Sequence, residues 1–136
     1  MKTYKGYITK LEDNQIFVCG TNTQGRHGKG AALWAEKNAG LKYGHMRGIC
    51  NQTYAIITKD LNKIVHPSIS GYIITEQIKD LYTFAENNKD KEFLIAYSSE
   101  GFNLNGYSDK EMASFFSSNT IPENIVFEEG FSKLLS

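Results

Sequence analysis

Two glycine-containing segments combine the residue types that bind anions. The first, residues 20–30, reads Gly-Thr-Asn-Thr-Gln-Gly-Arg-His-Gly-Lys-Gly, and the second, residues 98–107, reads Ser-Ser-Glu-Gly-Phe-Asn-Leu-Asn-Gly-Tyr. Glycine lets the backbone approach a ligand and turn its amides toward a phosphate, and hydroxyl and amide side chains add donors. The spacing fits neither the Walker loop nor the dinucleotide fingerprint. Tight turns needed for packing are the alternative explanation of the first segment.

Individual side chains in or near these segments have chemistry that suits a phosphorylated sugar. The imidazole of His27 titrates near neutrality and could activate water, although loop histidines often serve only as donors to backbone. The amide of Asn22 could orient a ribose hydroxyl or a water molecule. Lys59, Arg26 and Arg47 could neutralise a phosphate, or be solvated cations. Glycosidic hydrolysis usually needs two carboxylates, and only Glu100 lies inside a loop, so hydrolysis is neither established nor excluded.

The surrounding pattern predicts an α/β fold in which strands alternate with helices. Short apolar runs predict strands, and apolar stripes, glycine stops and a Ser-x-x-Glu capping box predict helices. Such alternation is typical of a mostly parallel sheet covered on both faces, a three-layer α/β/α sandwich. Ligands bind such sheets beyond the carboxyl ends of the strands, where both segments fall. The expected strands are 4–8, 16–19, 54–57, 93–97 and 125–127, and the expected helices are 31–37, 74–85 and 108–116.

Composition restricts the class of protein. With 136 residues, we expect one domain over 1–136, and 40% hydrophobic residues suit a folded chain. The 15 basic and 15 acidic residues give no net charge, so we expect neither strong nucleic-acid affinity nor a membrane partner. The two cysteines form no disulfide framework, and no signal peptide is apparent, so we expect a cytoplasmic protein. Histidines and cysteines lack metal-ligand spacing, so we expect no metal and no cofactor.

Charge is divided along the chain despite this neutrality. Residues 1–50 hold eight basic and three acidic residues, together with eight of the 12 glycines. A glycine-rich basic first third favours an anion site built partly from backbone. Two differently charged solvated faces are the plain alternative.

Several segments taken together resemble the macro domain family, in particular its small bacterial and phage macro-like proteins. Residues 18–22 and 25–32 look like the first ligand loop of that family, and residues 54–59 look like its next strand. Residues 98–107 look like its second, phosphate-gripping loop, which usually ends Gly-Tyr, and residues 122–127 look like its closing strand. The resemblance spans residues 15–135 and rests on the order of the segments.

The resemblance implies a macro-type fold that binds ADP-ribose or a related NAD-derived nucleotide, free or attached to a macromolecule. It assigns the distal ribose to Asn22, and Asn22 and His27 are our candidates for organising ribose and water in a hydrolase. Cys19, Thr21 and Glu100 depart from the family pattern, and Glu100 puts a negative charge where phosphate would lie. The expected ligand-binding residues are Gly20, Thr21, Asn22, Gly25, Arg26, His27, Gly28, Lys29, Gly30, Lys59, Ser98, Ser99, Gly101, Phe102, Asn103, Gly106 and Tyr107.

Three functions are compatible with these residues. As an enzyme, the protein would remove ADP-ribose from a modified macromolecule. As a binder, it would sequester a nucleotide signal or recognise an ADP-ribosyl mark without chemistry. In the third, the cleft has decayed and the protein acts by contacting another protein. The absence of an evident acid–base pair favours the binder slightly.

Overall fold

The computed structural model describes residues 1–97 and 105–135 and contains a six-stranded, mostly parallel sheet. The strand order is β1-β6-β5-β2-β4-β3, and only β3 runs antiparallel to its neighbour. The predicted α/β class with a mostly parallel sheet is therefore confirmed. The strands are β1 (Thr3–Tyr4), β2 (Gln15–Asn22), β3 (Gly48–Cys50), β4 (Thr53–Lys59), β5 (Glu92–Ile95) and β6 (Ile125–Glu128), and the helices are α1 (Gly30–Asn38), α2 (Gly71–Glu86), α3 (Asp109–Ser117) and α4 (Glu129–Ser132).

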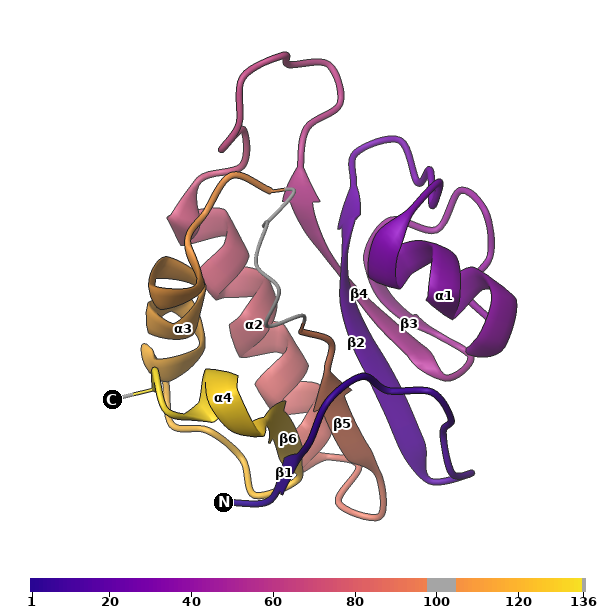
Figure 1. The fold of residues 1–136 in the computed structure, drawn as a ribbon, viewed down its shortest axis with the longest axis vertical. Helices are drawn as coiled ribbons and strands as arrows, with labels where there is room; N and C mark the ends of the chain where they lie inside the picture. The colour runs from indigo at the N-terminus through magenta and orange to yellow at the C-terminus, as the bar shows by residue number, and fades with distance from the viewer. Residues whose placement is uncertain (98–104, 136) are drawn as a thin grey trace.

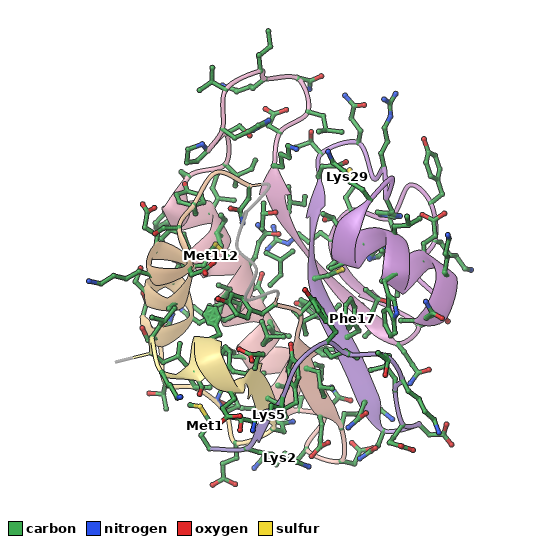
Figure 2. All side chains as sticks on the ribbon, viewed as in Figure 1. Met1, Lys2, Lys5, Phe17, Lys29 and Met112 are labelled. Carbon is green, nitrogen blue, oxygen red and sulfur yellow. The ribbon has the colours of Figure 1, made fainter. Side chains whose placement is uncertain are left out.

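Helices pack against both faces of the sheet because the central strands are apolar on both faces. Along β2, Ile16 and Val18 join one buried cluster, whereas Phe17 and Cys19 join another. The first cluster includes the apolar faces of α2 and α3, and the second includes α1. Figure 1 shows α1 apart from α2, α3 and α4, and Figure 2 labels Phe17 on β2. A continuous apolar run is the pattern expected of a strand buried on both faces.

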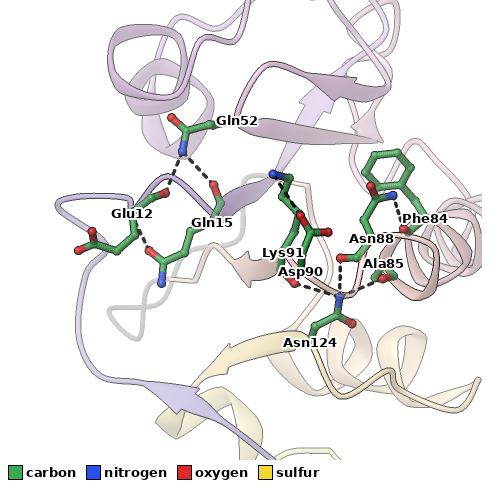
Figure 3. A network of polar contacts seen from close by, with 9 residues as sticks. All are labelled: Glu12, Gln15, Gln52, Phe84, Ala85, Asn88, Asp90, Lys91 and Asn124. Atoms are coloured by element: carbon green, nitrogen blue, oxygen red, sulfur yellow. Dashed lines mark hydrogen bonds and ion pairs between the residues drawn. The ribbon is translucent and has the colours of Figure 1, made fainter.

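Polar side chains tie together the starts of the parallel strands. Asn124, just before β6, donates from Nδ2 to the carbonyls of Ala85, Asn88 and Lys91 at 2.9, 3.2 and 3.0 Å (Figure 3). Gln52, just before β4, donates from Nε2 to the carbonyls of Glu12 and Gln15, each at 3.0 Å. These amides satisfy backbone carbonyls at the amino edge of the sheet, as buried polar groups require.

The three longer helices begin in different ways. α3 has the predicted capping box: Glu111 donates its backbone N–H to Ser108 Oγ at 3.1 Å, and Ser108 N donates to Glu111 Oε1 at 3.0 Å. α2 begins after Ser70, whose Oγ accepts from Ile73 N. α1 follows Lys29, which supplies no side-chain cap, and its first turn has no acidic residue. The first amides of α1 therefore lack the side-chain acceptor that the other two helices have.

Several element boundaries differ from those predicted. β2 continues through Asn22, so Thr21 and Asn22 belong to the strand and not to the loop. The predicted strand 4–8 is reduced to Thr3–Tyr4, and the edge strand β3 and the helix α4 were not predicted. These elements have two to four residues, too few for a periodic apolar pattern to show. Within the described residues, no helix is both long and apolar enough to cross a membrane.

Candidate functional site

A hollow of about 320 Å³ lies at the carboxyl ends of β2 and β4, beside the start of α1. We call it the basic hollow because three of its lining residues are Arg26, Lys29 and Lys59. Its size is that of a small-molecule site. The carboxyl ends of neighbouring parallel strands are where ligands bind α/β sheets. The basic hollow is lined by Gly20, Thr21, Asn22, Arg26, Gly28, Lys29, Ala32, Thr58, Lys59, Leu61 and Asn105.

An irregularity in the pairing of β2 with β4 places two of these residues side by side. The register shifts between Thr21 and Asn22, so that Asn22 lies opposite Lys59. The chain then turns, and Thr23 N donates to the carbonyl of Lys59 at 3.0 Å. Bulges of this kind redirect side chains and are frequent beside functional sites. The shift therefore brings an amide and an ammonium to one rim of the basic hollow.

In the part of the chain that the structure describes, no carboxylate is paired with the cations of the basic hollow. Among the described residues, no ion pair involves Arg26, Lys29 or Lys59. Asp60 follows Lys59, but its Oδ1 accepts from Thr23 Oγ1 at 3.2 Å and from Asn62 N at 2.9 Å. The amino end of α1 adds partial positive charge to the same side. The hollow is therefore electrostatically suited to an anion.

Asn22 organises the loop that it begins. Its Oδ1 accepts from the backbone N–H groups of Gln24 and Arg26, each at 3.1 Å, and its Nδ2 donates to the carbonyl of Arg26 at 2.7 Å. The amide oxygen therefore accepts two hydrogen bonds, and the amide nitrogen has already donated one. Asn22 lines the basic hollow, but its principal contacts are with its own loop. This geometry describes a residue that positions the backbone around the hollow.

His27 lies inside the protein and lines neither this hollow nor the second one described below. Its side chain has no exposed surface, Nδ1 lies 2.9 Å from Glu36 Oε2, and Nε2 lies 3.0 Å from the carbonyl oxygen of His45. The imidazole thus joins the loop to α1 and to the segment before β3. The expected contact of His27 with ligand is not present in this geometry, because burial and two polar contacts occupy the ring. Its role is to position the loop.

Three further predicted residues serve packing. Gly25 has φ +64°, and a Cβ there would lie 2.5 Å from the backbone of Gly44. Gly106 has φ +87°, and a Cβ there would lie 2.5 Å from Pro67 N. Tyr107 donates its hydroxyl to the carbonyl of Ile69 at 2.6 Å. Close packing therefore accounts for glycine at both positions. For Gly25, this is the alternative explanation given for the first segment, a tight turn needed for packing.

A second, apolar hollow of about 140 Å³ adjoins the first on the α2 and α3 side of the sheet. Gly20, Thr58 and Asn105 line both hollows. A Cβ at Gly20 would lie 2.7 Å from Thr58 Oγ1, so a side chain there would crowd the junction. The apolar hollow is lined by Val18, Cys19, Gly20, Ile56, Thr58, Ile74, Ile78, Ile95, Ala96, Tyr97, Asn105, Asp109, Met112, Phe116 and Phe131.

Two ionisable groups that line the apolar hollow, the Tyr97 hydroxyl and the Cys19 thiol, are held in their neutral forms. Tyr97 donates its hydroxyl to Asp109 Oδ2 at 2.7 Å. Burial, followed by that hydrogen bond to a carboxylate, raises the pKa of Tyr97 to about 12. Burial alone raises the pKa of the Cys19 thiol to about 12, so this cysteine is not a nucleophile at neutral pH.

The structure brings together part of the predicted set. The residues that line the basic hollow but were not predicted are Ala32, Thr58, Leu61 and Asn105. Thr58 and Asn105 directly precede the predicted residues Lys59 and Gly106, whereas no sequence motif contains Leu61. Gly30, the first residue of α1, lines neither hollow. Ser98, Ser99, Gly101, Phe102 and Asn103 lie outside the described residues, as does Glu100. The predicted residues that line the basic hollow are Gly20, Thr21, Asn22, Arg26, Gly28, Lys29 and Lys59.

Neither a search for metal-binding side chains nor comparison with known proteins assigns a function to the two hollows. Over residues 1–97 and 105–135, no three histidine, cysteine, aspartate or glutamate side chains gather as a metal site would require. Comparison with protein-family models, with curated proteins and with solved structures found no significant match.

Proposed function

We propose that this chain is a macro-type domain that binds ADP-ribose or a related NAD-derived nucleotide in the two joined hollows. One observation carries the proposal: a basic hollow and an apolar hollow meet at Gly20, Thr58 and Asn105. A nucleotide has the matching pair of properties, because it joins anionic phosphates to an aromatic base whose flat faces pack against apolar side chains. An inorganic anion or a purely apolar ligand would use only one of the two hollows.

The basic hollow is the proposed phosphate and ribose side. Arg26, Lys29 and Lys59 provide charge, and the backbone around Gly28 allows close approach. The amides at the start of α1, which no side chain caps, are available to a phosphate oxygen. Asn22 and His27 hold this loop in shape, so little ordering is needed when the ligand arrives.

The apolar hollow is the proposed side for the base. Its walls come from isoleucines of β4 and α2 and from aromatic and methionine side chains near α3. A hollow of about 140 Å³ can admit one six-membered ring, so the second ring of adenine would lie toward the junction with the basic hollow. At the junction with the basic hollow, Thr58 Oγ1 donates to the carbonyl of Thr21, and Asn105 accepts from Tyr107 N and donates to Met112 Sδ. The lone pairs of the Thr58 hydroxyl and the second N–H of the Asn105 amide are left to orient the ligand.

The arrangement of elements supports the macro-type assignment. With α1 on one face of the sheet and α2 and α3 on the other, we propose the three-layer sandwich that the resemblance implies. The loop after β2 lies where the resemblance places the first ligand loop. The order of β2, its loop, β4 and β6 along the chain follows the order of the segments in the resemblance and supports the proposal.

Binding without hydrolysis is the version of the function that the geometry favours. The sequence offered Asn22 and His27 as organisers of water and ribose. The imidazole of His27 is buried between Glu36 and the carbonyl of His45, and the amide of Asn22 is bonded to its own loop. A general base must reach the proton that it removes. We therefore propose a nucleotide binder, and release of ADP-ribose from a modified macromolecule is the alternative to test.

Thermal unfolding with and without ligand tests this function. ADP-ribose, NAD and AMP would be added separately, with inorganic phosphate as the control for simple anion binding. At one hundred times its dissociation constant, a bound ligand adds about 2.7 kcal/mol to the free energy of unfolding. We expect the largest shift with ADP-ribose, and no shift with any nucleotide would refute the proposal. Incubation with ADP-ribosylated peptide, followed by mass spectrometry, would show whether ADP-ribose is released.

A further inference from the structure

The buried imidazole of His27 lies between two oxygen atoms that accept hydrogen bonds. Nδ1 is 2.9 Å from Glu36 Oε2, and Nε2 is 3.0 Å from the carbonyl oxygen of His45. A neutral imidazole carries one N–H, whereas the imidazolium ion carries an N–H on each nitrogen. A neutral ring can therefore donate to only one of these oxygens, and the other contact would set two lone pairs against each other around a side chain with no exposed surface.

The contacts that the structure describes for the other two histidines need only one ring proton. His45 Nε2 lies 2.9 Å from the carbonyl oxygen of Gly48, and one N–H satisfies that contact. His66 Nδ1 lies 2.7 Å from Ser68 Oγ, and a hydroxyl can donate as well as accept. Both of these rings are also partly exposed, whereas His27 is buried. The demand for two ring protons therefore distinguishes His27.

The charges around His27 suit a positive ring. Glu36 faces it from α1, and direct contact with a carboxylate offsets the cost of burying an imidazolium ion. From the segment before β3, Tyr43 approaches edge-on, with the two ring centroids 6.4 Å apart. In the loop between β2 and α1, residues 23–29, the charged neighbours are Arg26 and Lys29, which line the basic hollow that the imidazole does not reach.

Loss of one ring proton would release a specific contact. The remaining proton would stay on Nδ1, because the carboxylate of Glu36 is a stronger acceptor than a carbonyl. The contact of Nε2 with the carbonyl of His45 would then be lost. That contact holds the 23–29 loop to the segment before β3, next to the hydrogen bond of 2.9 Å from Gly44 N to the carbonyl of Gly25. Deprotonation would therefore loosen the loop on this side.

We infer that His27 is an imidazolium ion in the folded protein, and that loss of its second proton as the pH rises weakens ligand binding in the basic hollow. Arg26, Gly28 and Lys29 of the same loop line that hollow, so movement of the loop changes the groups around the ligand. The contacts are complete in the protonated form, so binding is stronger before the proton is lost than after. This inference rests on the proposed function and adds to it a regulation by pH.

Nuclear magnetic resonance of the ¹⁵N-labelled protein without ligand counts the ring protons. Substitution of each histidine by glutamine assigns its signals. We expect both nitrogens of His27 to carry protons at pH 7, where a free imidazole is mostly neutral. In Glu36→Gln the amide can donate to Nδ1, so a neutral ring keeps both contacts, and the second proton should be lost about one pH unit lower or more. One protonated nitrogen at pH 7 in the folded, unaltered protein would refute the inference.

Isothermal titration with ADP-ribose at pH 6.5 and pH 8.5 measures the effect on binding. The diphosphate of this probe does not titrate between these values, so a difference reports on the protein. We expect the dissociation constant of the unaltered protein to be about two- to tenfold larger at pH 8.5, which corresponds to one hydrogen bond. Protection of the Gly44 amide from hydrogen exchange should fall over the same range. His27→Gln should bind equally at both values, and the control His66→Gln should keep the dependence on pH.

The outcomes separate this inference from the proposed function. If ADP-ribose binds equally at pH 6.5 and pH 8.5, the regulation is refuted and the proposed function stands. If His27→Gln and Glu36→Gln keep the full dependence on pH, another group is responsible and the inference is refuted. If ADP-ribose binds at neither value, the proposed function fails and the regulation of binding fails with it, while the proton count and the Gly44 amide still report on the ring. Circular dichroism checks that each variant is folded.

Discussion

Replacing Lys59 with methionine removes one cation from the basic hollow and leaves the strand in place. The pairing of β4 with β2 and the acceptance of Thr23 N by the carbonyl of Lys59 use only backbone atoms. No ion pair with a described residue is lost. We therefore expect the free energy of unfolding to change by less than about 0.5 kcal/mol, as for a surface substitution.

The affinity for ADP-ribose should fall much more than the stability. A hydrogen bond to a charged group contributes about 1.5 to 3 kcal/mol. Lys59 is partly exposed, so solvent screens its charge and the lower half of that range applies. The expected loss is about 10-fold to 40-fold in dissociation constant. Arg26 and Lys29 remain, so binding should be weakened and not abolished.

Isothermal titration at two salt concentrations measures this effect. The matched control is Lys63→Met, which removes the same charge from an exposed position between β4 and α2 that does not line the hollow. We expect the control to bind free ADP-ribose normally and the Lys59 variant to show a weaker dependence on salt. Equal affinities of the two variants would refute the assignment of Lys59 to the phosphate. A large loss of melting temperature in the Lys59 variant would refute the claim that its side chain serves the ligand and not the fold.

Three other substitutions distinguish ligand contacts from structural ones. Gly28→Leu should abolish ADP-ribose binding with little loss of stability, because a Cβ at Gly28 meets open space in the hollow. Gly25→Ala should lower the melting temperature, because its Cβ would meet the backbone of Gly44. Equal melting temperatures of the two variants would contradict this distinction. His27→Ala should lower the free energy of unfolding by about 2 kcal/mol or more, because Glu36 and the carbonyl of His45 lose their contacts with the buried imidazole. Urea titration measures this change, and an unchanged midpoint of unfolding would exclude the positioning role. At pH 8, a thiol reagent should modify Cys50 alone in the folded protein and both cysteines in urea, because Cys19 is buried and burial raises its pKa to about 12. Modification of two thiols without urea would show that Cys19 is accessible.

The sequence predicted those elements whose signal is strong and local. The continuous apolar runs identified β2 and β4, and the pattern Ser-x-x-Glu identified the start of α3. The stripe from Ile74 to Ala85 is the buried face of α2. The short elements β3 and α4 were missed because three or four residues are too few to show a period.

The sequence predicted which edge of the sheet carries the basic hollow, but it did not predict which way each polar side chain turns. A glycine-rich loop after a buried parallel strand must lie at the carboxyl edge of the sheet, and seven of the predicted residues line the basic hollow there. Spacing alone does not tell whether a polar side chain turns toward the ligand or toward its own backbone. His27 turns inward because Glu36, nine residues later on α1, offers a carboxylate that no loop motif contains.

The inward-turned residues explain how a loop of glycines can bind a ligand. Glycines make close approach possible, but an unconstrained glycine loop loses much conformational entropy when it is ordered. In this protein Asn22 fixes the turn through three hydrogen bonds, and His27 joins the same loop to α1 and to the segment before β3. Much of the ordering thus occurs on folding, before the ligand arrives. If the proposed function holds, the polar residues that resemble catalytic groups in the sequence would support binding indirectly, by holding the backbone in the shape that surrounds the anion.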